Sequence, residues 1–83
     1  MAVFLLIIES DEVAFEAMLS NFVPKEDIYK VKPGHIMVAA AMTAQQLSKA
    51  LPEQRHIVFS ISNYYGRYTP ELWEWLKIKL ERN

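Results

Sequence analysis

The chain contains no cysteine, and this absence removes several chemistries at once. Without a thiol there is no disulfide, no thiolate nucleophile and no sulfur-ligated zinc site. Long hydrophobic runs are also missing: the run at Val3–Ile8 is far shorter than the ~20 residues that a membrane helix needs. Phosphate-loop, dinucleotide-binding and metalloprotease motifs are absent as well. We therefore expect no membrane segment and none of these common catalytic centres.

Neither acidic nor basic residues are in excess, because 10 Asp and Glu balance 9 Lys and Arg to give a net charge of −1. No global electrostatic field draws the chain to nucleic acid, although a local basic patch remains compatible with this balance. The N-terminus has neither the positive segment nor the small-residue cleavage site of a signal peptide. We accordingly expect a cytoplasmic protein.

The composition that is present is typical of one small globular domain over residues 1–83. Hydrophobic residues make up 52% and charged residues 23% of the 83 residues. A chain of this length buries only ~60% of its unfolded surface, so its own core gives modest stability. Dimerisation is a common remedy, and we expect a homodimer.

Val3–Ile8 is uninterrupted by polar residues and is followed by Glu9, Ser10 and Asp11. A short apolar run bounded by polar residues predicts a strand that is covered on both faces. Alternate side chains point to opposite faces, so the two faces comprise Val3, Leu5 and Ile7 on one side and Phe4, Leu6 and Ile8 on the other.

A helix is expected directly after this strand. Ser10 or Asp11 provides the N-cap, and Asp11 and Glu12 complement the positive end of the helix dipole. Pro24 ends the region. The apolar face comprises four residues at helical spacing, namely Phe15, Met18, Leu19 and Phe22.

A hairpin follows. Residues 28–32 alternate between polar and apolar, and lysines at Lys30 and Lys32 are typical of an edge strand. Pro33 and Gly34 form a tight turn. Residues 35–41 are almost wholly apolar and predict a second inner strand.

The second half repeats the pattern of helix and strand. Thr43 and Gln46 predict a capping box for a helix that runs to about Leu51. Residues 56–62 alternate and predict a second edge strand. After a loop at 63–68, Thr69 and Pro70 begin a last helix. The order predicts an α+β protein: a ferredoxin-like βαββαβ sandwich with an added C-terminal helix.

The last helix carries a wide apolar arc, formed by Leu72, Trp73, Trp75, Leu76 and Leu80. The right-handed crossovers place both internal helices on one face of the sheet, so the other face needs a cover. Either this helix packs on its own sheet, or Trp73, Trp75 and Ile78 meet a second subunit, because aromatic residues are enriched at interfaces.

A first candidate site lies where the first strand ends. We expect Glu9, Ser10, Asp11, Thr43 and His56 to gather at one end of the sheet. Glu9 and Asp11 are candidate acid–base or metal-binding residues, and Glu9 from two protomers is a candidate magnesium ligand pair. The alternative is that Asp11 and Glu12 are simple helix N-terminal charges.

A second candidate site is the loop at the opposite end of the predicted sheet. Tyr64, Tyr65 and Arg67 mix aromatic rings with a cation, as surfaces that bind single-stranded nucleic acid do, and Lys30 and Lys32 extend the basic character. The alternative is that the tyrosines pack on the sheet and the arginine is solvated. We also expect His35 beside this loop.

His56 belongs to the first of these sites and His35 to the second. We therefore expect the two histidines to lie a strand length apart, ~17–20 Å, too far to share a metal within one protomer.

Three stretches carry a resemblance to a known group of proteins: the apolar first strand, the segment 37–47, and the ending Trp73-Glu74-Trp75-Leu76-Lys77. The layout resembles small ferredoxin-like proteins that include SinR-like phage and bacterial proteins, the small subunit of the CRISPR spacer-acquisition complex, and GhoS-type antitoxins. The resemblance implies the fold and a tendency to homodimerise. Family members that are nucleases tend to place an Asp at the end of the first strand, where it would bind metal between two protomers; the matching position here is Glu9, or Ser10 with a one-residue slip.

Three functions follow as hypotheses. The first is a homodimeric protein-interaction module without catalysis, in a phage or defence-system setting that the resemblance alone supplies. The second is a metal-dependent nuclease that uses Glu9 and Asp11 with magnesium. The third is a module that binds nucleic acid through Arg67 and the tyrosines.

Overall fold

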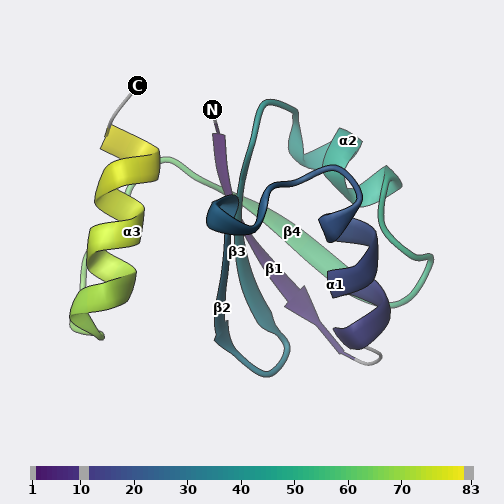
Figure 1. Ribbon diagram of the computed structural model, residues 1–83, viewed down its shortest axis with the longest axis horizontal. Coiled ribbons are helices and arrows are strands. Elements are labelled where there is room, and N and C mark those ends of the chain that lie inside the picture. Colours follow the sequence, from purple (N-terminus) through teal and green to yellow (C-terminus); the bar gives the residue numbers. More distant parts are fainter. Residues whose placement is uncertain (1, 10–11, 82–83) are drawn as a thin grey trace.

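The computed structural model describes residues 2–9 and 12–81, which form a small α+β fold around one antiparallel sheet (Figure 1). None of the helices in this part of the chain is long and apolar enough to cross a membrane. The elements in chain order are β1 (Ala2–Ile8), α1 (Glu12–Ser20), the 3-10 turn η1 (Lys25–Asp27), β2 (Ile28–Lys32), β3 (His35–Ala40), α2 (Ala44–Lys49), β4 (His56–Ile61) and α3 (Pro70–Glu81).

The strands lie in the order β2-β3-β1-β4, and every neighbouring pair is antiparallel. The two uninterrupted apolar strands, β1 and β3, are therefore the inner ones, as their composition predicts. The half-polar strands β2 and β4 form the edges. The register sets Leu5 opposite Met37 on one side and opposite Phe59 on the other.

Helices α1 and α2 cover the same face of the sheet (Figure 1). The core on this face joins side chains of β1 and β3 to Phe15 and Leu19 of α1 and to Leu47 of α2. The predicted capping box is confirmed: the Gln46 N–H donates to Thr43 Oγ1 at 3.1 Å, and the Thr43 N–H donates to Gln46 Oε1 at 2.9 Å.

The predicted apolar stripe of α1 is half right. Phe15 and Leu19 are buried, but Met18 and Phe22 are exposed and Val23 is buried instead. The helix ends at Ser20, so Phe22 no longer follows the helical spacing. The Val23 N–H donates to the Leu19 carbonyl at 2.8 Å, where the chain has left the helix. The expected caps Ser10 and Asp11 lie outside the described residues.

Helix α3 packs on the opposite face of the sheet (Figure 1). Leu76 is buried there against Val3, Met37 and Ala39, with Leu72, Trp75 and Leu80 packed around them. Ile78 is exposed, as its position outside the apolar arc predicts. The helix contacts β1 and β2, so it covers the β2 side of this face more fully than the β4 side.

Candidate interaction surface

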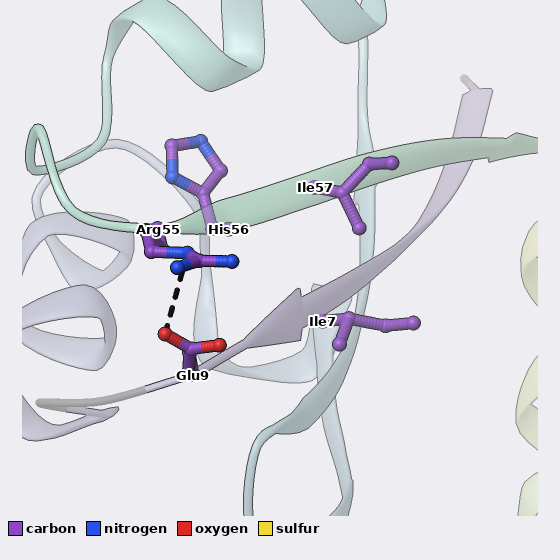
Figure 2. Close-up of a pocket in the computed structure, with 5 residues that line it drawn as sticks. All are labelled: Ile7, Glu9, Arg55, His56 and Ile57. Carbon is purple, nitrogen blue, oxygen red and sulfur yellow. Dashed lines mark ion pairs between the residues drawn. The ribbon is translucent and has the colours of Figure 1, made fainter.

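The part of the sheet that α3 leaves open carries an apolar patch, defined here as Ile7, Ile57 and Phe59. Ile7 is 36% exposed, Ile57 49% and Phe59 43%, although all three project from a sheet. Ile7 lies directly opposite Ile57, and Phe59 lies opposite Leu5 on the same face. Figure 2 shows Ile7 and Ile57 side by side on neighbouring strands. The apolar patch is therefore one contiguous surface.

The position of α3 explains why this surface stays open. The Trp75 Nε1–H donates to the Glu26 carbonyl at 3.0 Å, and the ring lies against Tyr29 with centroids 5.9 Å apart. One turn further on, Lys79 Nζ contacts Asp27 Oδ1 at 2.7 Å. These anchors join α3 to η1 and β2, which lie at the sheet edge farthest from β4.

An exposed ion pair borders the apolar patch. Arg55 Nε lies 3.3 Å from Glu9 Oε1, and both residues line a shallow hollow of about 280 Å³ with Ile7, His56 and Ile57 (Figure 2). Both side chains are mostly exposed, so the pair contributes little stability. The ion pair places polar groups at one end of the apolar patch, and polar groups commonly border the apolar centre of a protein interface.

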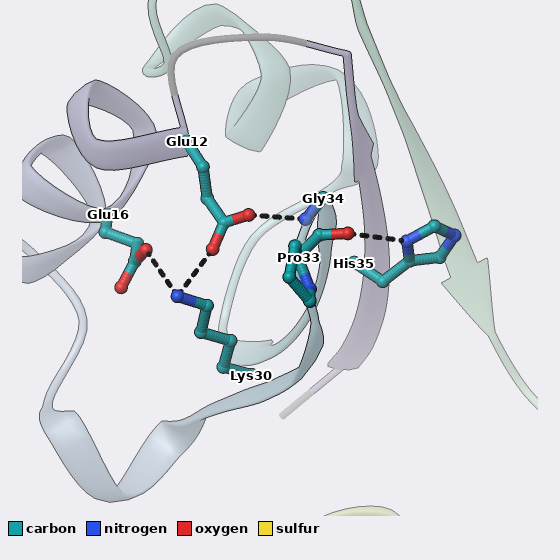
Figure 3. A network of polar contacts seen from close by, with 6 residues as sticks. All are labelled: Glu12, Glu16, Lys30, Pro33, Gly34 and His35. Atoms are coloured by element: carbon teal, nitrogen blue, oxygen red, sulfur yellow. Dashed lines mark hydrogen bonds and ion pairs between the residues drawn. The ribbon is translucent and has the colours of Figure 1, made fainter.

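Lys30 belongs to a polar network on the sheet face that α1 and α2 cover. It does not join the aromatic loop, defined here as residues 63–68. Its Nζ lies 2.7 Å from Glu12 Oε2 and 3.4 Å from Glu16 Oε2, while the Gly34 N–H donates to Glu12 Oε1 (Figure 3). The hydrogen bond from Lys30, together with that from Gly34, lowers the pKa of Glu12. The same contacts with Glu12 and Glu16 raise the pKa of Lys30. The network joins α1 to the β2–β3 hairpin.

The aromatic loop lies against α3. The ring centroids of Tyr64 and Trp73 are 5.2 Å apart, and those of Tyr65 and Trp73 are 6.5 Å apart. Tyr65 is nevertheless 99% exposed, and Tyr68 and Arg67 are exposed as well. Tyr64 is thus half-buried, as the packing alternative predicts, while the remaining rings and the guanidinium face solvent. Lys32 is exposed at the far end of β2, opposite His35.

The expected arrangement of the sheet ends is right for Glu9 and His56 and wrong for His35 and Thr43. Because β1 and β3 are antiparallel, the end of β1 meets the start of β3, and Ile7 lies opposite His35. The start of β4 is at the same end, where Ile8 lies opposite His56. Thr43 follows the end of β3 and is therefore at the other end of the sheet from Glu9.

Both histidines thus flank the end of β1 instead of lying a strand length apart. They project to opposite faces, because their partners Ile7 and Ile8 do. His56 packs against Phe15 with ring centroids 5.2 Å apart, and its Nε2 lies 2.8 Å from Ser48 Oγ. His35 Nδ1 lies 3.4 Å from the Pro33 carbonyl oxygen. His35 is not beside the loop that follows β4.

Of the two candidate metal-binding residues, the structure describes only Glu9. Glu9 contacts Arg55, and Asp11 lies outside the described residues. Within residues 2–9 and 12–81, no three His, Asp or Glu side chains gather closely enough to hold a metal ion. The first candidate site therefore gains no support as a metal centre from this part of the chain.

The candidate interface residues of α3 divide into two groups. Trp73 and Trp75 are half-buried and make the ring contacts described above within the chain, whereas Ile78 faces solvent.

The apolar patch was not predicted from the sequence. The available signal was the alternation in β4, which sets Ile57 and Phe59 on the face opposite the two internal helices.

Comparisons with known proteins give no relative: no family model, no curated protein and no solved structure matches this chain.

Proposed function

We propose that this chain is a homodimeric protein-interaction module built on a ferredoxin-like βαββαβ sandwich with an added C-terminal helix. The strand order β2-β3-β1-β4, with α1 and α2 on one face, supports the ferredoxin-like part of the proposal. The additional helix α3 accounts for the partial cover of the other face.

The observation that carries the proposal is the apolar patch beside the open edge of β4. Large apolar side chains that lie scattered on a surface need no explanation, but contiguous ones beside a polar rim indicate an interaction site. In this chain Ile7, Ile57 and Phe59 are contiguous, and Glu9 and Arg55 border one end of them. A second copy is the simplest partner, because a small domain gains stability by burying such a surface.

The test is the mass in solution of the wild-type chain and two lysine variants. Phe59→Lys places a charge in the apolar patch, and Val13→Lys places the same charge at an exposed position on α1. Sedimentation equilibrium over a concentration series should give a dimer for wild type and Val13→Lys, with affinity about 100-fold weaker or more in Phe59→Lys. Circular dichroism checks that each variant is folded.

Two results would count against the proposal. A wild-type chain that stays monomeric over the whole series refutes the homodimer. A Phe59→Lys dimer as tight as wild type shows that the apolar patch is not the contact surface.

A second candidate function is binding of single-stranded nucleic acid by the aromatic loop. The observation that favours it is the exposure of Tyr65 and Tyr68 beside Arg67, because exposed rings next to a cation stack on bases. The affinity for a labelled oligonucleotide, measured by fluorescence anisotropy, should then fall as the salt concentration rises and should be lower in Arg67→Ala than in wild type. Lys49→Ala on α2 is the charge-matched control, and equal affinity of the two variants would contradict binding through the aromatic loop.

A further inference from the structure

We propose that two copies join edge to edge through β4, in an antiparallel pair with Val58 on the two-fold axis opposite Val58 of the second copy. This inference rests on the proposed homodimer and specifies how its surfaces meet. This pairing, called here the β4 joint, would convert two four-stranded sheets into one continuous eight-stranded sheet.

The backbone of β4 identifies which groups are free to pair. The Ile8 N–H donates to the Gly34 carbonyl on the β3 side, whereas the Glu9 N–H donates to the Arg55 carbonyl on the β4 side. Because backbone groups alternate in direction along an antiparallel strand, the residues of β4 that bond to β1 are Ile57, Phe59 and Ile61. The N–H and C=O groups of the alternate residues, His56, Val58 and Ser60, therefore point outward from the sheet edge.

No described strand pairs with this outer edge of β4. An edge strand with free backbone groups is a template for another strand, and proteins usually protect such edges with charged residues. The other edge, β2, carries Lys30 and Lys32, and its register with β3 shifts between them. The segment His56–Ile61 contains no Asp, Glu, Lys or Arg. The two edges of the sheet thus differ, and β4 is the unprotected one.

A second β4 is the partner that closes the assembly. Pairing of β4 with β2 of another copy would leave free edges at both ends and continue into a filament. Pairing of β4 with itself is isologous, because each copy uses the same surface, and it ends at two. It also leaves the lysine-bearing β2 strands at the outer edges of the joined sheet, where they discourage further addition.

The side chains select the register. A two-fold axis perpendicular to the sheet keeps each face on its own side, so outward-pointing residues must pair with outward-pointing residues. With Val58 on the axis, His56 lies opposite Ser60 of the second copy, and Ile57 lies opposite the second copy's Phe59. With Phe59 on the axis instead, Val58 would face a serine. The first register sets apolar groups against apolar groups on both faces, and about six backbone hydrogen bonds close it.

This register also accounts for the apolar patch. Ile7 and Ile57 of one copy would continue into Phe59 and Leu5 of the second copy, which already lie opposite each other across β1 and β4. The two patches thereby become one stripe across the joint. Non-hydrogen-bonded pairs bring their side chains closer together, and Ile57 with the second copy's Phe59 is such a pair.

Single cysteines test the register directly, because the chain has none of its own. In a hydrogen-bonded antiparallel pair the Cα atoms are ~5.5 Å apart, within the ~4.4–6.8 Å range of a disulfide. Val58→Cys should therefore oxidise to a covalent dimer. In Ser60→Cys the two cysteines are offset by four residues, or ~13 Å, and should stay reduced. Val13→Cys on α1 controls for random collision.

A second measurement uses the unaltered chain. Amide hydrogen exchange at low and high protein concentration should show protection of His56, Val58 and Ser60 that rises at least ~10-fold on association. The Ile57 and Phe59 amides, which already bond to β1, should be protected at both concentrations.

The outcomes separate this inference from the proposed function. A wild-type dimer in which Val58→Cys links no faster than Val13→Cys, and in which the three outward amides gain no protection, overturns the β4 joint and leaves the homodimer standing. Faster linkage in Ser60→Cys than in Val58→Cys overturns the register. A wild-type chain that stays monomeric overturns both proposals.

Discussion

Removal of the carboxylate of Asp27 should destabilise the fold by much more than loss of a surface charge does. Asp27 lies in η1, and its side chain is 7% exposed, while that of Lys79 on α3 is 19% exposed. The two side chains are joined at 2.7 Å between Oδ1 and Nζ. Asp27→Ala would remove this carboxylate from beside an ammonium group that is largely shielded from water.

The magnitude follows from the burial. Breaking a fully buried ion pair by removal of one partner costs ~3–5 kcal/mol, and the partial exposure of Lys79 reduces this to about 2–3 kcal/mol. A domain of this size has a free energy of unfolding of roughly 4–12 kcal/mol. The variant should therefore lose a large share of its stability. Replacement of both partners should cost less, because the shielded charge of Lys79 is then removed together with the carboxylate.

A double-mutant cycle measures this coupling. Urea unfolding of wild type, Asp27→Ala, Lys79→Met and the double variant, followed by far-ultraviolet circular dichroism at one protein concentration, gives four free energies. The expected coupling energy is about 1.5–3 kcal/mol, the range of hydrogen bonds to charged groups. A coupling below ~0.5 kcal/mol is the value of an exposed pair and would refute the argument that this contact anchors α3.

Three further changes have defined outcomes. Contacts from Lys30 and Gly34 lower the pKa of Glu12 in the folded state, so their stabilisation is present above its usual pKa of about 4.3 and is lost as the pH falls through the lowered value. Glu12→Gln should accordingly unfold at lower urea than wild type at pH 7, and an equal deficit in strong acid would contradict this. Gly34 has φ +84°, and an added Cβ would lie 2.9 Å from the Ile8 carbonyl oxygen, so Gly34→Ala should cost about 1–3 kcal/mol in urea unfolding. Thr43→Ala removes the side-chain acceptor of the capping box and should cost about 1 kcal/mol, whereas an unchanged thermal midpoint would show that the cap contributes nothing.

The fold was largely predictable because its signals are local. Unbroken apolar runs identify β1 and β3 as inner strands, and alternation identifies β2 and β4 as edges. The capping box at Thr43 and Gln46 needs only residues three apart, and it is formed as expected. The end of α1 was less predictable, since the turn that buries Val23 depends on tertiary packing.

The candidate sites were less predictable because they depend on which strand ends meet. The error over Thr43 and His35 arose from the direction of β3 relative to β1, which hydrophobicity does not encode, whereas His56 lies at the Glu9 end as expected. The contact between Asp27 and Lys79 joins residues 52 positions apart, and no spacing rule in the sequence connects them. The apolar patch emerged only when the placement of α3 showed which part of the sheet stays uncovered.

The two tryptophans of the chain both lie in α3; Trp73 lies against Tyr64 and Tyr65 of the preceding loop, and Trp75 lies against Tyr29 of β2. Indole emission in this protein is consequently a local optical probe. Undocking of the C-terminal helix would alter the emission even while the rest of the molecule stays intact. Disruption confined to α1 or α2 would leave the signal nearly unchanged, so fluorescence and dichroism compared on one sample can separate the two events.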